Sequence, residues 1–75
     1  MDAMDHSRIH RDPAIMVGKP CIRGTRITVE HVLREVASGS SLADIALDYQ
    51  LSPDDIVAAI NYAAEAMRRE GRIAA

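Results

Sequence analysis

Turn-forming residues crowd the first third of the chain and limit what that part can fold into. Four of them precede Thr28: Pro13, Gly18, Pro20 and Gly24. Proline removes a backbone donor and clashes with the preceding helical turn, so a continuous helix before Thr28 is excluded. We therefore expect residues 1–27 to form an extended N-terminal arm.

Short β-prone segments alternate with these turns. Residues 15–17 and 21–23 flank the tripeptide Gly18-Lys19-Pro20, which predicts a loose hairpin or ribbon. Residues 9–11 are suited to a further short strand. Gly18 and Gly24 are expected at backbone turns that a β-carbon would hinder.

From Thr28 onwards the apolar residues follow the period of a helix. Thr28 is the expected N-cap of the first helix and Gly39 its stop. Its apolar stripe is Val29, Val32, Leu33 and Val36. Ser41 is the expected cap of a second, short helix. The apolar positions of that helix are Leu42, Ile45, Ala46 and Tyr49.

The third helix has the strongest start signal in the chain. Ser52 can cap it, Pro53 fits its first turn, and Asp54 and Asp55 face the positive end of its dipole. We expect it to run to about Glu70, with Gly71 as its stop and Arg68, Arg69 and Arg72 near its end. Its predicted core face is Ile56, Ala59, Ile60, Ala63 and Met67.

These elements predict one mainly α domain over residues 1–75. Residues 28–70 form its three-helix part, and the second and third helices carry the pattern of a helix-turn-helix. At 1.5 Å per residue the third helix is roughly 27 Å long and overhangs the two shorter ones. The overhang is the expected partner or dimer surface: Tyr62, Ala63, Ala64, Met67, Arg68 and Arg69. Alternatively, the ribbon folds back and covers it.

Charge is distributed unevenly over a chain whose formal net charge is −2. Residues 1–34 contain six Lys or Arg against four Asp or Glu, and residues 35–75 contain three against seven. A basic front suits an anionic partner. The candidate nucleic-acid contacts are Arg8, Arg11, Lys19, Arg23 and Arg26; five phosphate contacts would give a salt slope of about −4 to −5.

Two observations keep other roles open for these cations. Arg23 and Arg26 can equally reach the domain's own carboxylates, as surface ion pairs worth about 0 to 1 kcal/mol each. In addition, Asp54 and Asp55 at the start of the third helix would repel DNA there. A protein-interaction adaptor that never meets nucleic acid is therefore the alternative to a DNA-binding protein.

The sequence gives little support for a catalytic, metal or nucleotide site. Lys19 is followed by Pro20, which has neither the N–H nor the hydroxyl that a P-loop requires. The three histidines are scattered, and Cys21 is the single cysteine, which excludes an internal disulfide. We expect no catalytic residue, metal, cofactor or small-molecule substrate. The charged start and the lack of a membrane-spanning apolar run predict a cytoplasmic protein without a membrane anchor.

The run GKPCIRGTRI, from Gly18 to Ile27, followed by a helix opening at Val29, resembles domain-of-unknown-function family 433. The resemblance extends from about Ile9 to Met67. It implies a homeodomain-like or winged-helix-like helix-turn-helix with a short N-terminal β-ribbon. It also implies an antitoxin of a bacterial type II toxin-antitoxin pair, which binds a PIN-like ribonuclease toxin and represses its own operon. The homodimer that we expect rests instead on the small core of a chain without Phe or Trp, which favours self-association. Cys21 departs from the β-branched or proline residue usual at that position.

Overall fold

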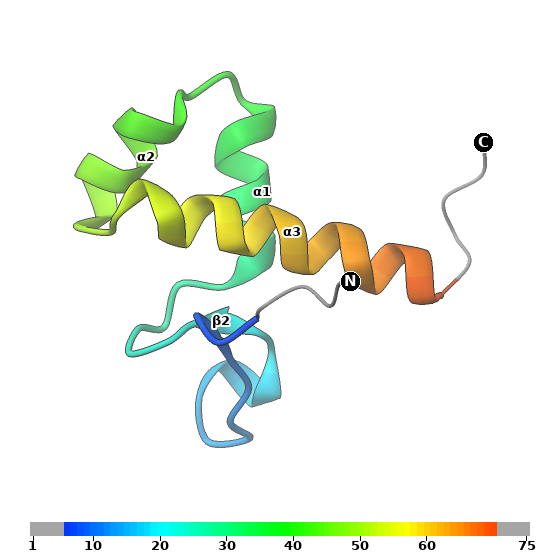
Figure 1. Cartoon of the computed structure of the whole chain (residues 1–75). Coiled ribbons are helices and arrows are strands. Elements are labelled where there is room, and N and C mark those ends of the chain that lie inside the picture. The colour runs from blue at the N-terminus through cyan, green and yellow to red at the C-terminus, as the bar shows by residue number, and fades with distance from the viewer. Residues whose placement is uncertain (1–5, 71–75) are drawn as a thin grey trace.

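The computed structural model describes residues 6–70 and has three helices and one two-stranded ribbon (Figure 1). Strands β1 (Ile9–His10) and β2 (Cys21–Ile22) enclose a 3-10 turn, η1 (Met16–Gly18). Helices α1 (Val29–Ala37), α2 (Leu42–Tyr49) and α3 (Pro53–Arg69) follow. The predicted mainly α bundle with an N-terminal β-ribbon is confirmed.

Each helix begins at a hydroxyl residue that caps it, as the sequence predicts. Thr28, Ser41 and Ser52 each accept a hydrogen bond from the backbone amide three residues further on. At α3 the Asp55 carboxylate also accepts from the Ser52 amide at 3.1 Å, which completes a capping box. Local sequence therefore fixes where all three helices start.

The helix ends are set by backbone conformation. Gly39, the predicted stop of α1, has a φ of 101°, a value that favours glycine. Helix α2 ends at Tyr49 and is capped by Gln50, whose φ of 58° and ψ of 44° are left-handed. Helix α3 ends at Arg69, whereas Gly71 and Arg72 lie outside the described residues.

The ribbon differs in one respect from the prediction. β1 and β2 pair antiparallel, with Ile9 opposite Ile22, but residues 15–17 do not form a strand. The Asp12 carbonyl accepts from the Ile15 amide at 2.8 Å and its carboxylate accepts from the Ala14 amide at 2.9 Å. This turn folds the segment back on itself, so the predicted strand at 15–17 is wrong.

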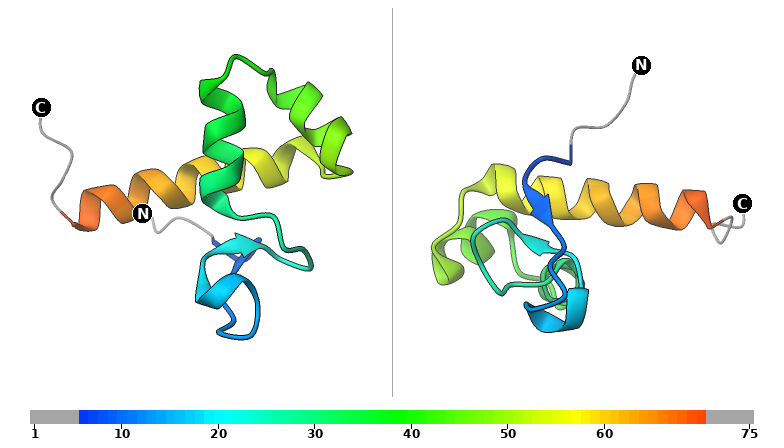
Figure 2. Two further views of the ribbon diagram at one scale, coloured as in Figure 1. Left: turned by 180° about the vertical axis from the view of Figure 1, so that it is seen from behind. Right: turned by 90° about the horizontal axis from the view of Figure 1, so that it is seen from below.

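The core joins the ribbon to the helices. Its buried apolar members are Ile9, Ile22, Val29, Val32, Ile45, Ala46, Ile56 and Ala59. Ile9 and Ile22 come from the ribbon, and Figure 2 shows β1 passing alongside α3. The ribbon is thus packed on the bundle and helps to bury it.

Helix α3 is longer than the elements that cover it. Figure 1 shows its last turns extending beyond α1, α2 and the ribbon. Ile56 and Ala59 are fully buried, but Met67, predicted on the same core face, is 48% exposed. The core assignment of Met67 is wrong because the bundle ends before the helix does. Within residues 6–70, no helix has the length and apolar character needed to cross a membrane.

Candidate functional site

A hydrogen-bonded loop holds the basic ribbon in shape. The Thr25 hydroxyl donates to the Ile22 carbonyl at 2.8 Å and accepts from the Ile27 amide at 2.9 Å. The Ile22 amide also bonds the Ile27 carbonyl at 2.9 Å, and Gly24 has a φ of 82°. Thr25 closes the loop with its two hydrogen bonds, and Gly24 adopts the positive φ that the loop requires. These two roles explain why a glycine and a threonine stand between Arg23 and Arg26.

The five candidate nucleic-acid contacts differ in the groups that they bind. Arg8 reaches the start of α3, where its guanidinium lies 2.8 Å from Asp55 and 3.9 Å from Asp54. Its charge is therefore largely matched by two carboxylates. The same contact reduces the negative charge that α3 would present to a nucleic acid.

Arg11 and Arg23 bind backbone carbonyls instead of carboxylates. Arg11 Nε donates to the Gly18 carbonyl at 3.1 Å, and Arg23 Nε donates to the Ser7 carbonyl at 2.7 Å. Arg23 also lies 3.4 Å from His10 Nδ1. Both guanidinium groups are held in place without being neutralised, so they remain available as exposed positive charge.

Lys19 and Arg26 are the two ribbon cations that the fold brings together. Lys19 Nζ lies 3.5 Å from Glu30 Oε1, and Arg34 lies 2.6 Å from Glu30 Oε2. Arg26 is exposed and has no ion pair or hydrogen bond within residues 6–70. The predicted alternative pairing of Arg23 and Arg26 with the domain's carboxylates is therefore absent from the described part of the chain.

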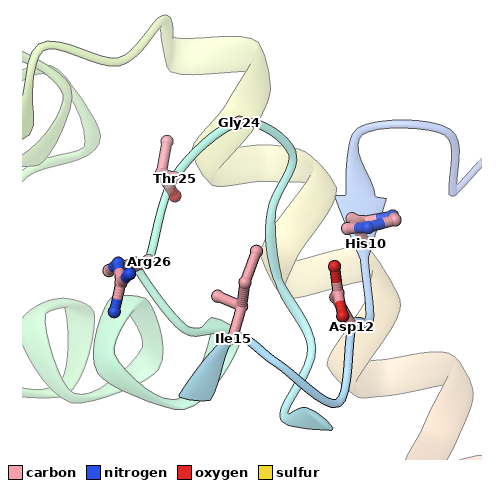
Figure 3. Close-up of a pocket in the computed structure, with 6 residues that line it drawn as sticks. All are labelled: His10, Asp12, Ile15, Gly24, Thr25 and Arg26. Atoms are coloured by element: carbon pink, nitrogen blue, oxygen red, sulfur yellow. The ribbon is translucent and has the colours of Figure 1, made fainter. Parts of the chain in front are cut away.

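Two hollows adjoin Arg26. The first, about 350 Å³, lies within the ribbon (Figure 3). Its lining residues are His10, Asp12, Ile15, Gly24, Thr25 and Arg26. Figure 3 shows His10 and Asp12 on one side of it, while the guanidinium of Arg26 points away from both. One carboxylate facing one imidazole offers too few polar groups to define a reaction site.

The second hollow, about 320 Å³, lies between the ribbon and helices α1 and α2. We call it the cationic cleft. Its polar lining is Lys19, Arg26, Thr28, Glu30, His31, Arg34 and Tyr49. Three of these lining side chains are cationic and one, Glu30, is a carboxylate. Glu35 and Asp48 do not line the cleft but act on its Tyr49 wall, and they offset part of this positive excess.

An aromatic pair forms one wall of the cationic cleft. His31 Nε2 lies 2.7 Å from the Tyr49 hydroxyl, which donates to Glu35 Oε2 at 3.4 Å. The two rings meet edge to face, with centroids 5.2 Å apart. Partial burial, together with the carboxylates of Glu35 and Asp48, raises the pKa of the Tyr49 phenol above its ordinary value.

The overhanging half of α3 forms one side of an apolar groove of about 350 Å³. Its lining residues are Lys19, Pro20, Thr28, Val29, Glu30, Leu33, Tyr62, Ala63, Ala66 and Met67. The ribbon contributes Lys19 and Pro20 to one edge, and His6 contacts Tyr62 with ring centroids 5.2 Å apart. Within residues 6–27 the ribbon borders residues 62–67 and does not cover Met67, which is 48% exposed, so this part of the chain does not form the cover that the alternative expects.

The other predicted interface residues lie around this groove. Tyr62 and Ala63 are half-buried, whereas Ala64 is exposed and does not line the groove. Arg68 pairs with Glu65 at 2.6 Å. Arg69 is exposed and, within the described chain, has no ion pair.

Residues 6–70 offer few groups of side chains suited to catalysis or metal binding. No three His, Cys, Asp or Glu side chains in that range come together as metal ligands. Cys21 is 3% exposed, and its thiol donates to the Lys19 carbonyl at 3.4 Å. It therefore acts as a small core residue.

Sequence reasoning missed three residues of the cationic cleft: His31, Arg34 and Tyr49. Arg34 has a local signal, since it lies four residues after Glu30 on the same helix face. His31 and Tyr49 are 18 residues apart and meet only once α1 and α2 pack. No spacing rule would have brought them together.

These surfaces define a small three-helix protein with a basic β-ribbon. Residues 9–63 match the family described as "Protein of unknown function (DUF433)", which spans more than half of the chain. The chain therefore belongs to this family. Searches of curated proteins and of solved structures find no significant match.

Proposed function

We propose that this protein is a non-catalytic, antitoxin-like partner of a PIN-like ribonuclease. The observation that carries the proposal is the open apolar groove beside the overhanging half of α3. A helix that continues beyond its own bundle, with small Ala63 and Ala66 beside Met67, permits close approach of another helix. The type II antitoxin role itself rests on the resemblance carried by residues 18–27.

Neutralisation would be steric. A toxin element seated in the groove would also face the end of α3, where two arginines follow Met67. Arg68 is already paired with Glu65 at 2.6 Å, whereas Arg69 is exposed and unpaired within the described residues. Arg69 is therefore the better candidate to meet the carboxylates that hold a nuclease metal, and neutralising them would block cleavage.

DNA binding belongs to the ribbon in this proposal. Arg11, Arg23 and Arg26 are exposed and not neutralised by a carboxylate within the described chain, and they lie on the segment before α1. Contacts of this kind would hold phosphates and supply affinity without reading bases. Autorepression as a homodimer would double the number of such contacts.

The negative charge at the start of α3 favours the alternative function, a protein-interaction adaptor that does not bind nucleic acid. Asp54 and Asp55 stand at the start of α3, the position at which a recognition helix approaches the major groove. Arg8 pairs with both carboxylates and neutralises part of their charge. Its own charge is then not available to a phosphate. An adaptor would retain the groove interaction and show no salt-dependent DNA binding.

A matched pair of variants tests the groove. Met67 and Val57 are both on α3 and are 48% and 42% exposed, but only Met67 lines the groove. We expect Met67→Glu to weaken binding of the PIN-like partner by about 10-fold or more, because it places a charge in an apolar contact. Val57→Glu should bind like the parent protein. Calorimetry of the purified pair, with growth rescue in toxin-expressing cells, measures both.

Two outcomes would count against the proposal. Equal affinity of Met67→Glu and Val57→Glu would remove the groove as the docking surface. Failure of the parent protein to bind or inhibit the PIN-like protein encoded beside it would remove the antitoxin role. Undiminished inhibition by Arg69→Glu would leave docking intact and dispose of the arginine contribution alone.

A further inference from the structure

The cationic cleft is built from segments that are far apart in sequence. Lys19 and Arg26 come from the ribbon, Arg34 from α1 and Tyr49 from α2. A surface that only kept the protein soluble would not need to gather side chains from three elements around one hollow of about 320 Å³. The convergence points to a ligand.

The charges in the cleft specify an anion. Each oxygen of Glu30 is already engaged, Oε1 by Lys19 and Oε2 by Arg34. Glu30 therefore bridges these two cations and offsets one of their charges, and Arg26 is left without a counter-ion within residues 6–70. A metal cation would be repelled by the excess of positive charge, whereas an anion would complete it.

The donors in the cleft suit a phosphate better than a lone carboxylate. Two guanidinium groups present planar N–H pairs that match two phosphate oxygens, and Lys19 adds a point charge. Tyr49 and His31 form the wall behind these donors, with the Tyr49 hydroxyl hydrogen-bonded to His31 and Glu35. A tetrahedral group with several acceptor oxygens can use donors that approach from the ribbon, α1 and α2 together.

The exposure of these donors identifies the kind of phosphate. The side chains of Lys19 and Arg34 are 56% and 71% exposed, and that of Glu30 is 53% exposed. A cleft this open does not enclose a small free ligand, but it can receive a phosphate that projects from a long backbone. We infer that the cationic cleft anchors one backbone phosphate of DNA, an inference that rests on the DNA-binding part of the proposed function.

The test measures binding of a labelled short duplex to the full chain by fluorescence anisotropy over a range of salt concentrations. The double variant Arg26→Ala, Arg34→Ala should lower affinity about 10-fold and reduce the magnitude of the salt slope by about 1, the value for one lost phosphate contact. The double variant Arg68→Ala, Arg69→Ala, which removes two exposed cations at the far end of α3, is the charge-matched control and should change neither quantity.

Glu30→Gln gives the sharper result. It removes the negative charge from the cleft and frees Lys19 and Arg34. If the cleft holds a phosphate, this variant binds DNA more tightly than the parent protein does. If the cleft lies away from the bound DNA, the variant binds with the affinity of the parent protein, and that result would overturn the inference.

The experiment separates this inference from the proposed function. If the parent protein binds DNA and Arg26→Ala, Arg34→Ala binds it as well as Arg68→Ala, Arg69→Ala does, the cleft is not a phosphate site, although DNA binding itself stands. If the parent protein does not bind DNA, inorganic phosphate is added while the ring resonances of His31 and Tyr49 are followed by NMR. If phosphate shifts these resonances in the parent protein but not in the double variant Arg26→Ala, Arg34→Ala, the cleft binds free phosphate and the inference that it binds a DNA phosphate is wrong. If phosphate shifts no resonance, the cleft is not a phosphate site.

Discussion

Within residues 6–70, three residues that carry a β-carbon have left-handed backbone conformations: Met16, Val17 and Gln50. The φ of Val17 is 57°, although its side chain is β-branched and 91% exposed. Such conformations cost roughly 1–2 kcal/mol for L-residues. The strain at Val17 coincides with the tip of the ribbon, and the strain at Gln50 with the turn of the helix-turn-helix.

Gln50→Gly should stabilise the protein. Glycine removes the left-handed penalty of about 1–2 kcal/mol but adds about 0.5–1 kcal/mol of unfolded-state entropy. The free energy of unfolding should therefore rise by about 0.5–1 kcal/mol, measured by chemical denaturation. Gln50→Ala keeps a β-carbon at the same backbone position and should bring no such gain. Equal stability of the two variants would show that strain at this turn is negligible.

At the residue scale, the sequence predicts those features that depend on residues only a few positions apart. Thr28, Ser41 and Ser52 were identifiable as caps because the amide each one binds lies three residues away. Gln50 was not identifiable as a left-handed cap, since glutamine carries no local preference for that conformation. Val17 misled the prediction because a β-branched residue normally indicates a strand.

At the scale of elements, contacts across the chain decide where the charged side chains end up. Arg8 and Asp55 are 47 residues apart and form an ion pair at 2.8 Å. Helical spacing placed Asp55 at the start of α3 and composition placed Arg8 on the arm, but neither could join them. The groove was predictable only in part: the length of α3 implied an overhang, whereas its ribbon edge depended on packing.

Helices α1 and α2 are linked by the Tyr49 hydroxyl, which lies beside His31 and Glu35. The raised pKa of Tyr49 has a consequence for stability. The folded state holds the phenolic proton more tightly than the unfolded chain, whose tyrosine pKa is about 10. This stabilisation is complete below pH 10 and is lost as the pH rises through the folded value.

Glu35→Gln should therefore lower the pH at which Tyr49 ionises. Burial contributes most to the raised pKa, so part of the elevation remains after the carboxylate has gone. Phenolate absorbance in a Tyr62→Phe background isolates Tyr49, because the chain has two tyrosines. Glu65→Gln, on α3 and paired with Arg68, is the control and should leave the midpoint unchanged. An unchanged midpoint in Glu35→Gln would exclude Glu35 as a cause.

At the scale of the whole molecule, the ribbon and the helices share one core. Ile22 is 2% exposed and packs in the same cluster as Val32, Ile45 and Ile56. A chain of this size has a total stability of only about 4–11 kcal/mol. Contributions from the ribbon to the core are therefore a large fraction of what keeps the helices folded.

Ile22→Ala tests this dependence. Removing a buried isoleucine side chain typically costs about 2–5 kcal/mol, because contacts are lost and a cavity remains. Since α1, α2 and α3 pack on the same cluster, far-UV circular dichroism of the helices should show a lowered midpoint together with the NMR signals of the ribbon. Leu47→Ala, at a position on α2 that is 78% exposed, should shift the midpoint little. If Ile22→Ala melts the ribbon while the helices keep the parent midpoint, the two parts fold independently, and the cationic cleft between them cannot be a fixed site.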